Sequence, residues 1–215
     1  MKILVTGAKG FVGKNLCETL KNIRDGKDKT RGVSVDEVLE YDIDTPKETL
    51  AEYCKNADFV FHLAGVNRPK DEKEFMEGNF GFTSELLDNL KKHGSKAPIM
   101  ISSSIQAALD NPYGKSKKAG EDLIFQYGEC EGIKTLVYRF PNLFGKWCRP
   151  NYNSVIATFC NNIAHDLPIQ VNDPNHMLTL CYVDDVVDEL IRALKNEENN
   201  DGAYCKVPTE HKATL

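Results

Sequence analysis

The chain has 215 residues, of which 41% are hydrophobic and 27% charged, values ordinary for a globular protein. This length fits one α/β domain with a sizeable core. The formal net charge is −5 and no basic cluster stands out, which argues against binding to nucleic acid or to an anionic membrane surface. No apolar stretch approaches the ~20 residues needed to span a bilayer.

The seven cysteines, at positions 17, 54, 130, 148, 160, 181 and 205, lie far apart and form no C-x-x-C pair. No His-rich segment accompanies them, so the sequence predicts no metal site. An odd number of scattered cysteines fits reduced thiols in a cytoplasmic protein better than disulfides. The N-terminus enters a predicted strand at once, which leaves no room for a signal peptide and also favours the cytoplasm.

The first residues predict a strand, a glycine turn and a helix. Ile3, Leu4 and Val5 form an aliphatic run suited to a strand buried on both faces of a parallel sheet. A helical apolar pattern begins at Phe11 and continues to Leu20. Strand, turn and helix in this order are the context in which a glycine pattern indicates dinucleotide binding.

The glycines of this turn have the spacing Gly7-x-x-Gly10-x-x-Gly13. Gly7 permits a tight turn, Gly10 lets the backbone approach a pyrophosphate, and Gly13 lets the helix pack against the strand. Phe11 and Val12 then present free N–H groups, at the positive end of the helix, to the phosphates. This spacing resembles the variant of the Rossmann turn used by short-chain dehydrogenases/reductases.

A charged loop over 24–34 leads to a predicted second strand over 35–41, which ends at Asp42. An acid at this strand tip normally holds the adenosine ribose hydroxyls and favours NAD over NADP. Acids are also common at strand ends as solvated turn residues, so both interpretations of Asp42 stay open. Thr45-Pro46 predicts the next helix, with Thr45 as its cap and the proline at the first helical position.

Residues 58–65 predict another buried strand, and its end, Leu63-Ala64-Gly65, would let a cofactor lie against the backbone. His62 stands inside the apolar run and is interpreted as a hydrogen-bonded core histidine rather than a ligand. Arg68 follows at the carboxyl edge of the sheet, where open α/β folds bind their ligands. Arg68 is therefore a candidate for contact with a cofactor phosphate or with the substrate.

A long helix is predicted over 71–92, with Asn79 among its apolar positions. A strand over 97–101 leads to Ser102-Ser103-Ser104, and a further helix begins at Asn111-Pro112. The remaining predicted elements are, in order, a strand over 134–140, a helix over 154–165, a strand over 169–171, a helix over 184–195 and a strand over 204–207. This alternation predicts an α/β fold, a doubly wound parallel sheet of the Rossmann type.

Tyr113 and Lys117 are four residues apart and so share one helix face. A phenol with a pKa near ~10 is mostly neutral at cytoplasmic pH, and a nearby ammonium lowers that pKa. Tyr113 is thus a candidate general acid or base, and Lys117 can also hold the nicotinamide ribose. A serine of the 102–104 run, at the end of the preceding strand, can donate to a carbonyl oxygen undergoing reduction.

These motifs resemble those of the extended short-chain dehydrogenases/reductases, the NAD-dependent epimerase/dehydratase family, whose members act mainly on nucleotide sugars. The resemblance covers nearly the whole chain and rests on Thr6–Gly13, His62–Gly65, Asn79, Ser104 with Tyr113 and Lys117, Arg139–Gly145 and Tyr182–Asp185. It implies a catalytic triad of Ser104, Tyr113 and Lys117, with Ser103 as the fallback for the serine.

A narrower resemblance is to the reductases of UDP-N-acetyl-L-fucosamine synthesis for bacterial capsules. It rests on the segments Val66–Pro69, Ser102–Ala107, Asn111–Tyr113, Pro141–Cys148 and Pro150–Phe159. It implies reduction of the 4-keto group of a UDP-4-keto-6-deoxy-N-acetylhexosamine with NADPH. NADH stays open because of Asp42, whereas Lys9 or Arg68 is suited to accept the 2′-phosphate of NADPH.

The resemblance divides the chain into a dinucleotide-binding domain over 1–150 and a small, partial substrate-binding region over 151–215 that completes it. The further substrate-side helices and the C-terminal cupin domain of full-length relatives are expected to be absent, and a homodimer is a family-level expectation. The cofactor is expected at Gly7, Gly10, Phe11, Val12, Gly13, Asp42, Leu63, Ala64, Gly65, Arg68, Ser102, Tyr113, Lys117, Phe140 and Asn142. The nucleotide sugar is expected at Ser103, Asn142, Arg149 and Asn153.

Two alternatives to the reductase stay open. A 4-epimerase on the same scaffold would hold NAD tightly through every turnover, and a non-catalytic NAD(P)-binding module would have no need of the tyrosine. A 4,6-dehydratase is disfavoured, because those enzymes carry Asp-Glu directly after the catalytic hydroxyl residue. Here Ile105-Gln106 follows Ser104 and supplies no carboxylate.

Overall fold

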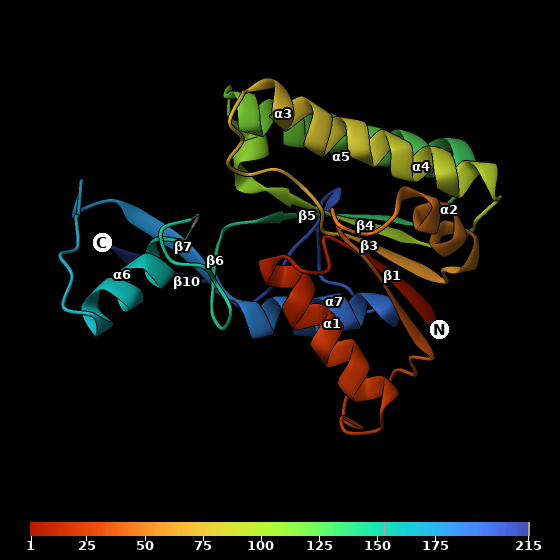
Figure 1. The fold of residues 1–215 in the computed structure, drawn as a ribbon, viewed down its shortest axis with the longest axis horizontal. Helices are drawn as coiled ribbons and strands as arrows, with labels where there is room; N and C mark the ends of the chain where they lie inside the picture. The colour runs from red at the N-terminus through yellow and green to blue at the C-terminus, as the bar shows by residue number, and fades with distance from the viewer. Residues whose placement is uncertain (153, 215) are drawn as a thin grey trace.

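The computed structural model describes residues 1–152 and 154–214. Two sheets organise the chain, a main sheet in the strand order β2-β1-β3-β4-β5-β9-β8 and a smaller one in the order β10-β7-β6 (Figure 1). The strands are β1 (Lys2–Thr6), β2 (Glu37–Tyr41), β3 (Phe59–His62), β4 (Ile99–Ser104), β5 (Thr135–Phe140), β6 (Asn142–Phe144), β7 (Met177–Tyr182), β8 (Asn200–Asp201), β9 (Tyr204–Cys205) and β10 (His211–Thr214). The helices are α1 (Phe11–Arg24), α2 (Lys47–Asn56), α3 (Lys73–Phe75), α4 (Phe82–Lys92), α5 (Pro112–Glu131), α6 (Val155–Ala164) and α7 (Val183–Leu194), with a π-helical segment over Met76–Gly81 and a 3₁₀ turn over Ile105–Ala108.

The main sheet is parallel from β2 to β9, and only its edge strand β8 runs antiparallel to its neighbour within the described chain. The chain crosses from β1 to β2 and then returns past β1 to β3, so the strand order reverses beside β1. Open α/β sheets bind ligands outside the carboxyl ends of the strands at such a reversal. The predicted Rossmann-type α/β fold is confirmed.

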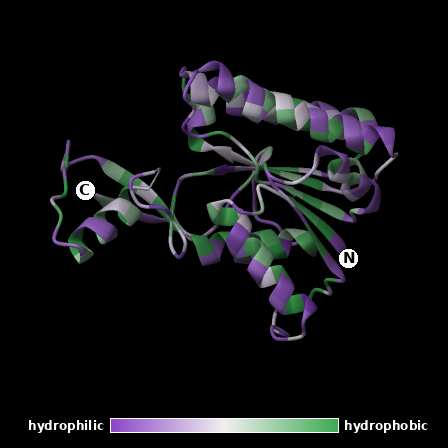
Figure 2. Ribbon diagram, viewed as in Figure 1, coloured by the Kyte–Doolittle hydropathy of each residue, from purple (hydrophilic) through white to green (hydrophobic). Residues whose placement is uncertain are grey.

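Helices cover both faces of the main sheet, with α1 and α7 on one face and α2, α4 and α5 on the other (Figure 1). Successive residues of β1 pack against the helices on opposite faces of the sheet, because side chains alternate across a strand. Ile3 and Val5 pack in the cluster that includes α1 and α7, whereas Leu4 packs in the opposite cluster. Figure 2 shows the hydrophobic strands between the more polar outer surfaces of the helices. The predicted strand buried on both faces is confirmed.

Several element boundaries differ from those predicted. β2 begins at Glu37 rather than at residue 35, and the helix predicted over 71–92 begins at Lys73 and contains the π-helical segment. The predicted cap at Thr45 is wrong, because Pro46 is the N-cap of α2. The Thr45 hydroxyl instead accepts a hydrogen bond from the Asp42 backbone N–H at 2.9 Å and so closes the turn after β2.

The strand predicted over 169–171 is wrong, and the strand of this region is β7. Ile169 and Val171 are 44% and 37% exposed and pair with no neighbouring strand in the described part of the chain. An Asx turn follows, in which the Asn175 N–H donates to the Asp173 carboxylate at 2.9 Å. The short apolar run therefore ends in a turn before a strand can form.

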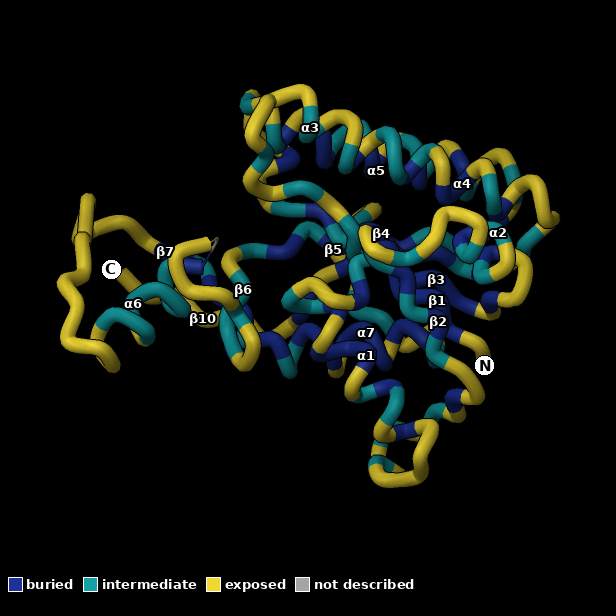
Figure 3. Tube along the Cα trace, viewed as in Figure 1, coloured by how far each residue is buried: buried dark blue, intermediate teal, exposed yellow. Residues whose placement is uncertain are grey.

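The smaller sheet is much less buried than the main sheet, as the yellow and teal trace around α6 shows (Figure 3). Ser154 caps α6 by accepting a hydrogen bond from the Ala157 N–H at 3.4 Å, yet within the described residues no side chain of this helix is buried. None of the helices in the described chain has both the length and the apolar composition that crossing a membrane requires.

Candidate active site

The glycine turn between β1 and α1 lies against the end of β3. Gly7 has a φ of +70°, and a Cβ at this position would lie 2.7 Å from the Ala64 backbone nitrogen. A Cβ at Gly13 would collide with the Gly7 carbonyl oxygen. At Gly10 the nearest obstacle is the Gly7 oxygen at 3.0 Å, so the position is bounded only by the turn itself. Gly7 and Gly13 are therefore required by packing, whereas a Cβ at Gly10 would meet a single tight contact with the backbone of the turn.

The N-terminus of α1 is arranged to receive an anion. Gly10 is the N-cap, and no side chain in the described structure caps the helix there. The first backbone bond of the helix runs from the Lys14 N–H to the Gly10 carbonyl at 2.9 Å. The N–H groups of Phe11, Val12 and Gly13 thus remain at the positive end of the helix dipole. A helix start without a side-chain cap, behind a glycine, fits the pyrophosphate of a dinucleotide.

Asp42 lies at the same turn. Its carboxylate accepts hydrogen bonds from the Lys9 N–H at 2.7 Å and from the Ile43 N–H at 2.8 Å. The Lys9 ammonium pairs with Asp44, and this pairing raises the lysine pKa. Asp42 and Lys9 are the acid and the base expected to discriminate NAD from NADP. Both lie where the glycine turn meets the end of β2.

The serine run at the end of β4 is split between two faces, because strand side chains alternate. Ser103 is buried and its hydroxyl donates to Glu121 at 2.5 Å. Ser102 and Ser104 are half-buried on the other face, and the Ser102 hydroxyl donates to the His62 carbonyl at 3.4 Å. The burial of Ser103 and its bond to Glu121 argue against the predictions that it binds the sugar or replaces Ser104.

Ser103 instead belongs to a buried ionic cluster around Glu121 of α5, which the sequence analysis did not identify. Arg139 of β5 holds this carboxylate with two bonds, at 2.8 and 2.6 Å. The ring of Tyr204 in β9 stacks against the Arg139 guanidinium, and the Arg139 Cζ lies 4.0 Å from the ring centroid. Glu121 lies in the middle of a helix and Arg139 on a strand, and the two meet only in the folded structure. No local sequence pattern predicts such a pair.

Tyr113 and Lys117 come from the first two turns of α5. The Asn111 side chain accepts a hydrogen bond from the Gly114 N–H at 2.7 Å and so caps the helix just before Pro112. Lys117 is 7% exposed, and its ammonium donates to the Ser102 carbonyl at 3.1 Å. The same ammonium lies 6.0 Å from the centroid of the Tyr113 ring.

The ionisation of this pair differs from the prediction. Burial raises the pKa of the Tyr113 phenol, and a hydrogen bond with the Ser104 hydroxyl opposes that rise. The predicted lowering of the Tyr113 pKa by Lys117 is therefore wrong in the free protein. Burial lowers the pKa of Lys117 to about 8, against the attraction of Glu121. Ser104, Tyr113 and Lys117 nevertheless meet at the carboxyl edge of the sheet, as their order in the sequence predicted.

Gly65 lies directly beneath Lys117 and Asn79. A Cβ at Gly65 would lie 2.7 Å from the Asn79 Oδ1 and 2.9 Å from the Lys117 Nζ. Asn79 belongs to the π-helical segment, and its amide bonds both the Val66 N–H, at 2.9 Å, and the Val66 carbonyl, at 3.1 Å. Asn79 and Lys117 therefore occupy the space next to Gly65, and a side chain at this position would displace one of them.

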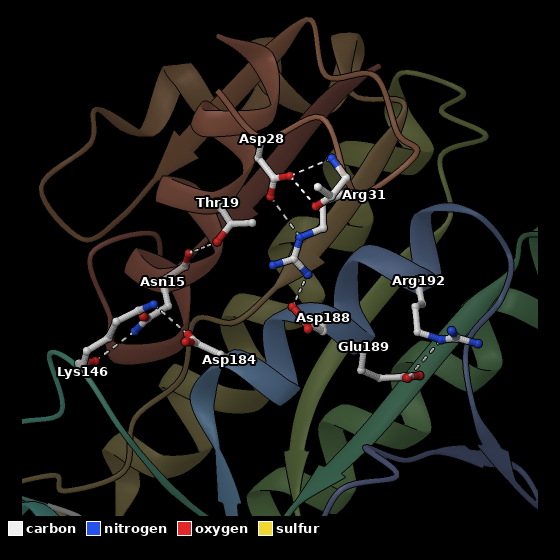
Figure 4. Close-up of polar contacts among 10 residues, drawn as sticks. Asn15, Thr19, Asp28, Arg31, Lys146, Asp184, Asp188, Glu189 and Arg192 are labelled. Carbon is white, nitrogen blue, oxygen red and sulfur yellow. Dashed lines mark hydrogen bonds and ion pairs between the residues drawn. The ribbon is translucent and has the colours of Figure 1, made fainter. Parts of the chain in front are cut away.

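The segment after β5 is fixed to α1 and α7 (Figure 4). The Asn15 amide in α1 donates to the Lys146 carbonyl at 3.1 Å, and the Lys146 ammonium pairs with Asp184 at 2.8 Å. Phe140 is buried against Tyr138, with ring centroids 5.7 Å apart. Asn142 is exposed in β6.

The remaining predicted ligands lie toward the smaller sheet. Arg68 is exposed, with its guanidinium 3.5 Å from the Asn151 carbonyl and over the Tyr152 ring at 5.7 Å. It therefore contacts the 151–152 segment rather than the glycine turn. Arg149 is also exposed. Asn153, the fourth predicted sugar ligand, lies outside the described residues.

Comparisons with known proteins give matches in both sequence and fold. Residues 3–204 match the NAD dependent epimerase/dehydratase family. The UDP-2-acetamido-2,6-beta-L-arabino-hexul-4-ose reductase of Pseudomonas aeruginosa is 44% identical over 200 residues, which are 93% of this chain and 51% of that protein. The capsular polysaccharide assembling protein CapF of Staphylococcus aureus superimposes with a TM-score of 0.86 at 48% identity, covering 100% of this chain and 56% of that one.

A more distant solved structure, the UDP-glucuronic acid 4-epimerase of Bacillus cereus in complex with UDP-glucuronic acid and NAD, has a TM-score of 0.78 at 23% identity and shares the fold. The chain spans about half the length of the Pseudomonas and Staphylococcus proteins. The family resemblance noted in the sequence is confirmed.

Proposed function

The chain belongs to the NAD dependent epimerase/dehydratase family, and from that premise we propose that it is the reductase part of a nucleotide-sugar enzyme. The reaction is reduction of the 4-keto group of a UDP-activated 6-deoxy-N-acetylhexosamine. The observation that carries the proposal is the meeting of Ser104, Tyr113 and Lys117 beside the glycine turn. The 44% identity to a reductase whose name describes a 4-ulose substrate supports the choice of reaction.

The chemistry requires a hydride at the keto carbon and a proton at the keto oxygen. A bound reduced nicotinamide supplies the hydride. Tyr113 holds the proton, because burial raises its pKa and keeps the phenol neutral near pH 7. The Ser104 hydroxyl, which lies close enough to the Tyr113 phenol to oppose the rise of its pKa, is placed to donate to the same oxygen while negative charge develops on it. Lys117 offers its remaining N–H donors to the nicotinamide ribose and a positive charge to the developing phenolate.

The cofactor is an NAD-type dinucleotide, and we propose NADPH. Lys9 is the cation at the glycine turn, and a 2′-phosphate would compete with Asp44 for it. The case for NADH rests on Asp42, whose carboxylate already accepts two backbone N–H bonds and would repel a phosphate nearby. For the remaining contacts we retain the backbone of 63–65, Ser102, Phe140 and Asn142.

The nucleotide sugar would extend from the catalytic groups toward residues 151–215. Asn142 and Arg149 are exposed on that side, and we retain them with Asn153 as sugar ligands. We move Arg68 from the cofactor to the substrate, because its guanidinium contacts the 151–152 segment. In this proposal 1–150 bind the dinucleotide and 151–215 contribute part of the sugar pocket. A homodimer remains a family-level proposal.

The first test is titration of the chain with NADPH and with NADH, by calorimetry or by nicotinamide fluorescence. Loss of nicotinamide absorbance on addition of the 4-keto sugar nucleotide then reports turnover. Tyr113→Phe should lower turnover by about 10²–10⁴-fold and leave dinucleotide affinity intact, whereas Tyr53→Phe in α2 is the matched control. Purification with tightly held NAD would favour the epimerase, and full turnover by Tyr113→Phe would refute the mechanism. A chain that binds neither dinucleotide would refute the proposal itself.

A further inference from the structure

A continuous set of buried polar side chains connects the glycine turn with the helix that carries Tyr113 and Lys117. Its members are Thr6, His62, Thr83, Asn79 and Ser116, and each is at most 4% exposed. They come from β1, β3, α4, the π-helical segment and α5. Buried polar groups are costly unless each is bonded, so their arrangement is informative.

His62 is the centre of this set. Its Nδ1 lies 2.7 Å from the Thr6 Oγ1, and its Nε2 lies 2.8 Å from the Thr83 Oγ1. The Thr83 hydroxyl donates its proton to the Asn79 carbonyl at 2.5 Å, so it can only accept from the ring. We therefore assign the neutral Nε2–H tautomer, in which Nδ1 accepts from Thr6.

Each arm from His62 ends at a different part of the proposed site. Toward the dinucleotide, the Thr6 hydroxyl also accepts from the Ala64 N–H at 3.4 Å, and it stands next to Gly7, which packs on Ala64. The imidazole therefore fixes the Thr6 hydroxyl, and through it the Ala64 N–H, at the paired ends of β1 and β3, across which the dinucleotide would lie.

The other arm leads through Thr83 to Asn79. The Asn79 amide holds Val66 and donates to the Ser116 hydroxyl at 2.9 Å, and Ser116 in turn donates to the Tyr113 carbonyl at 2.8 Å. Ser116 directly precedes Lys117. The second arm thus fixes the first turn of α5.

We propose that His62 is a positioning residue that couples the glycine turn to the Tyr113–Lys117 helix, one ring nitrogen serving each arm. The inference rests on the proposed function, since it assigns the turn to a dinucleotide. Imidazole suits this role because its two nitrogens point in different directions, one accepting and one donating.

Two conservative variants separate the arms. His62→Asn keeps an acceptor near the Nδ1 position for Thr6, and His62→Gln keeps a donor near the Nε2 position for Thr83. Both lose one hydrogen bond and some packing, so we expect similar losses of thermal stability. Dinucleotide affinity should differ: His62→Gln should bind about five- to tenfold more weakly, the effect of one neutral hydrogen bond, and His62→Asn within about twofold of the wild type.

The measurements are thermal unfolding and calorimetric titration of the three proteins with NADPH and NADH. Equal affinities in both variants, or losses that simply follow stability, would reduce His62 to a core histidine. A wild-type chain that binds neither dinucleotide overturns the proposed function together with the coupling, whereas wild-type binding without the split overturns the coupling alone.

A second measurement does not depend on binding. Two-bond ¹⁵N–¹H spectra of ¹⁵N-histidine protein distinguish the two neutral tautomers, and the His62→Gln spectrum identifies the signal among the five histidines. We expect the Nε2–H form. The Nδ1–H form would reverse the donor and acceptor roles and contradict the proposed coupling.

Discussion

Replacement of Gly65 by alanine tests whether the backbone after β3 and the Lys117 side chain occupy the positions described. The added methyl would lie 2.7 Å from the Asn79 Oδ1 and 2.9 Å from the Lys117 Nζ, where van der Waals contact needs more than 3 Å. Gly65 is outside the left-handed region, so backbone strain is not involved. Either Asn79 gives up a bond to Val66 or Lys117 gives up its bond to the Ser102 carbonyl.

Loss of a buried hydrogen bond with its partner left unsatisfied costs about 1–3 kcal/mol, and a substitution that also displaces Lys117 should weaken dinucleotide binding. We expect Gly65→Ala to lower the free energy of unfolding by about this amount. The matched control is Gly120→Ala in the middle of α5, where the methyl would meet Ile101 Cδ1 at 3.5 Å, an ordinary contact. That variant should be neutral or stabilised by up to about 1 kcal/mol.

The assays are chemical denaturation and dinucleotide titration of both variants. The close approach of Asn79 and Lys117 to residue 65 would be refuted if Gly65→Ala, like the control Gly120→Ala, kept the stability and the dinucleotide affinity of the wild type. Retained stability with lost affinity would show that Lys117, rather than Asn79, makes way for the methyl.

Two further predictions concern the turn and the buried histidine. Gly10→Val should abolish dinucleotide binding with a smaller loss of stability than Gly13→Val, because its Cβ would lie 3.0 Å from the Gly7 carbonyl oxygen, whereas a Cβ at Gly13 would collide with that oxygen. Equal thermal stabilities for the two variants would contradict this. Burial and the charge of Lys117 lower the pKa of His62 to about 3 from 6.5. Between pH 6.5 and pH 3 the unfolded chain therefore binds one proton more than the folded chain. The free energy of unfolding falls as the pH is lowered through this window, by up to about 1.4 kcal/mol per pH unit. His62→Gln should show a shallower acid slope in denaturation at pH 4–7, and an unchanged slope would show that His62 is not buried neutral.

Local patterns were sufficient for much of the fold and for bringing the candidate catalytic residues together. The strand at Ile3–Val5, the glycine turn and the Tyr113–Lys117 spacing each depend on neighbours along the chain. Such features are set by backbone geometry and by periodicity, which a sequence displays directly. They placed the serine, tyrosine and lysine at the correct edge of the sheet.

What the sequence could not predict depends on contacts between distant segments. The face of Ser103 follows from the pleat of β4, but only the presence of Glu121 in space makes it a structural hydroxyl. The π-helical segment around Asn79 likewise follows from bonds to Val66 across the core. The failed strand at 169–171 shows the converse, because an apolar run forms no strand where no partner lies beside it.

Lys117 and Glu121 are both buried on α5, and together they determine the charge of the lysine in the proposed site. Glu121 lies one helical turn after Lys117, and its charge raises the lysine pKa while burial lowers it. Arg139 binds that carboxylate through two bonds and fixes its position. With a pKa of about 8, Lys117 is protonated roughly ten to one at pH 7. The ionic cluster around Glu121 therefore helps to preserve the positive charge on Lys117 that the proposed proton transfer from Tyr113 requires.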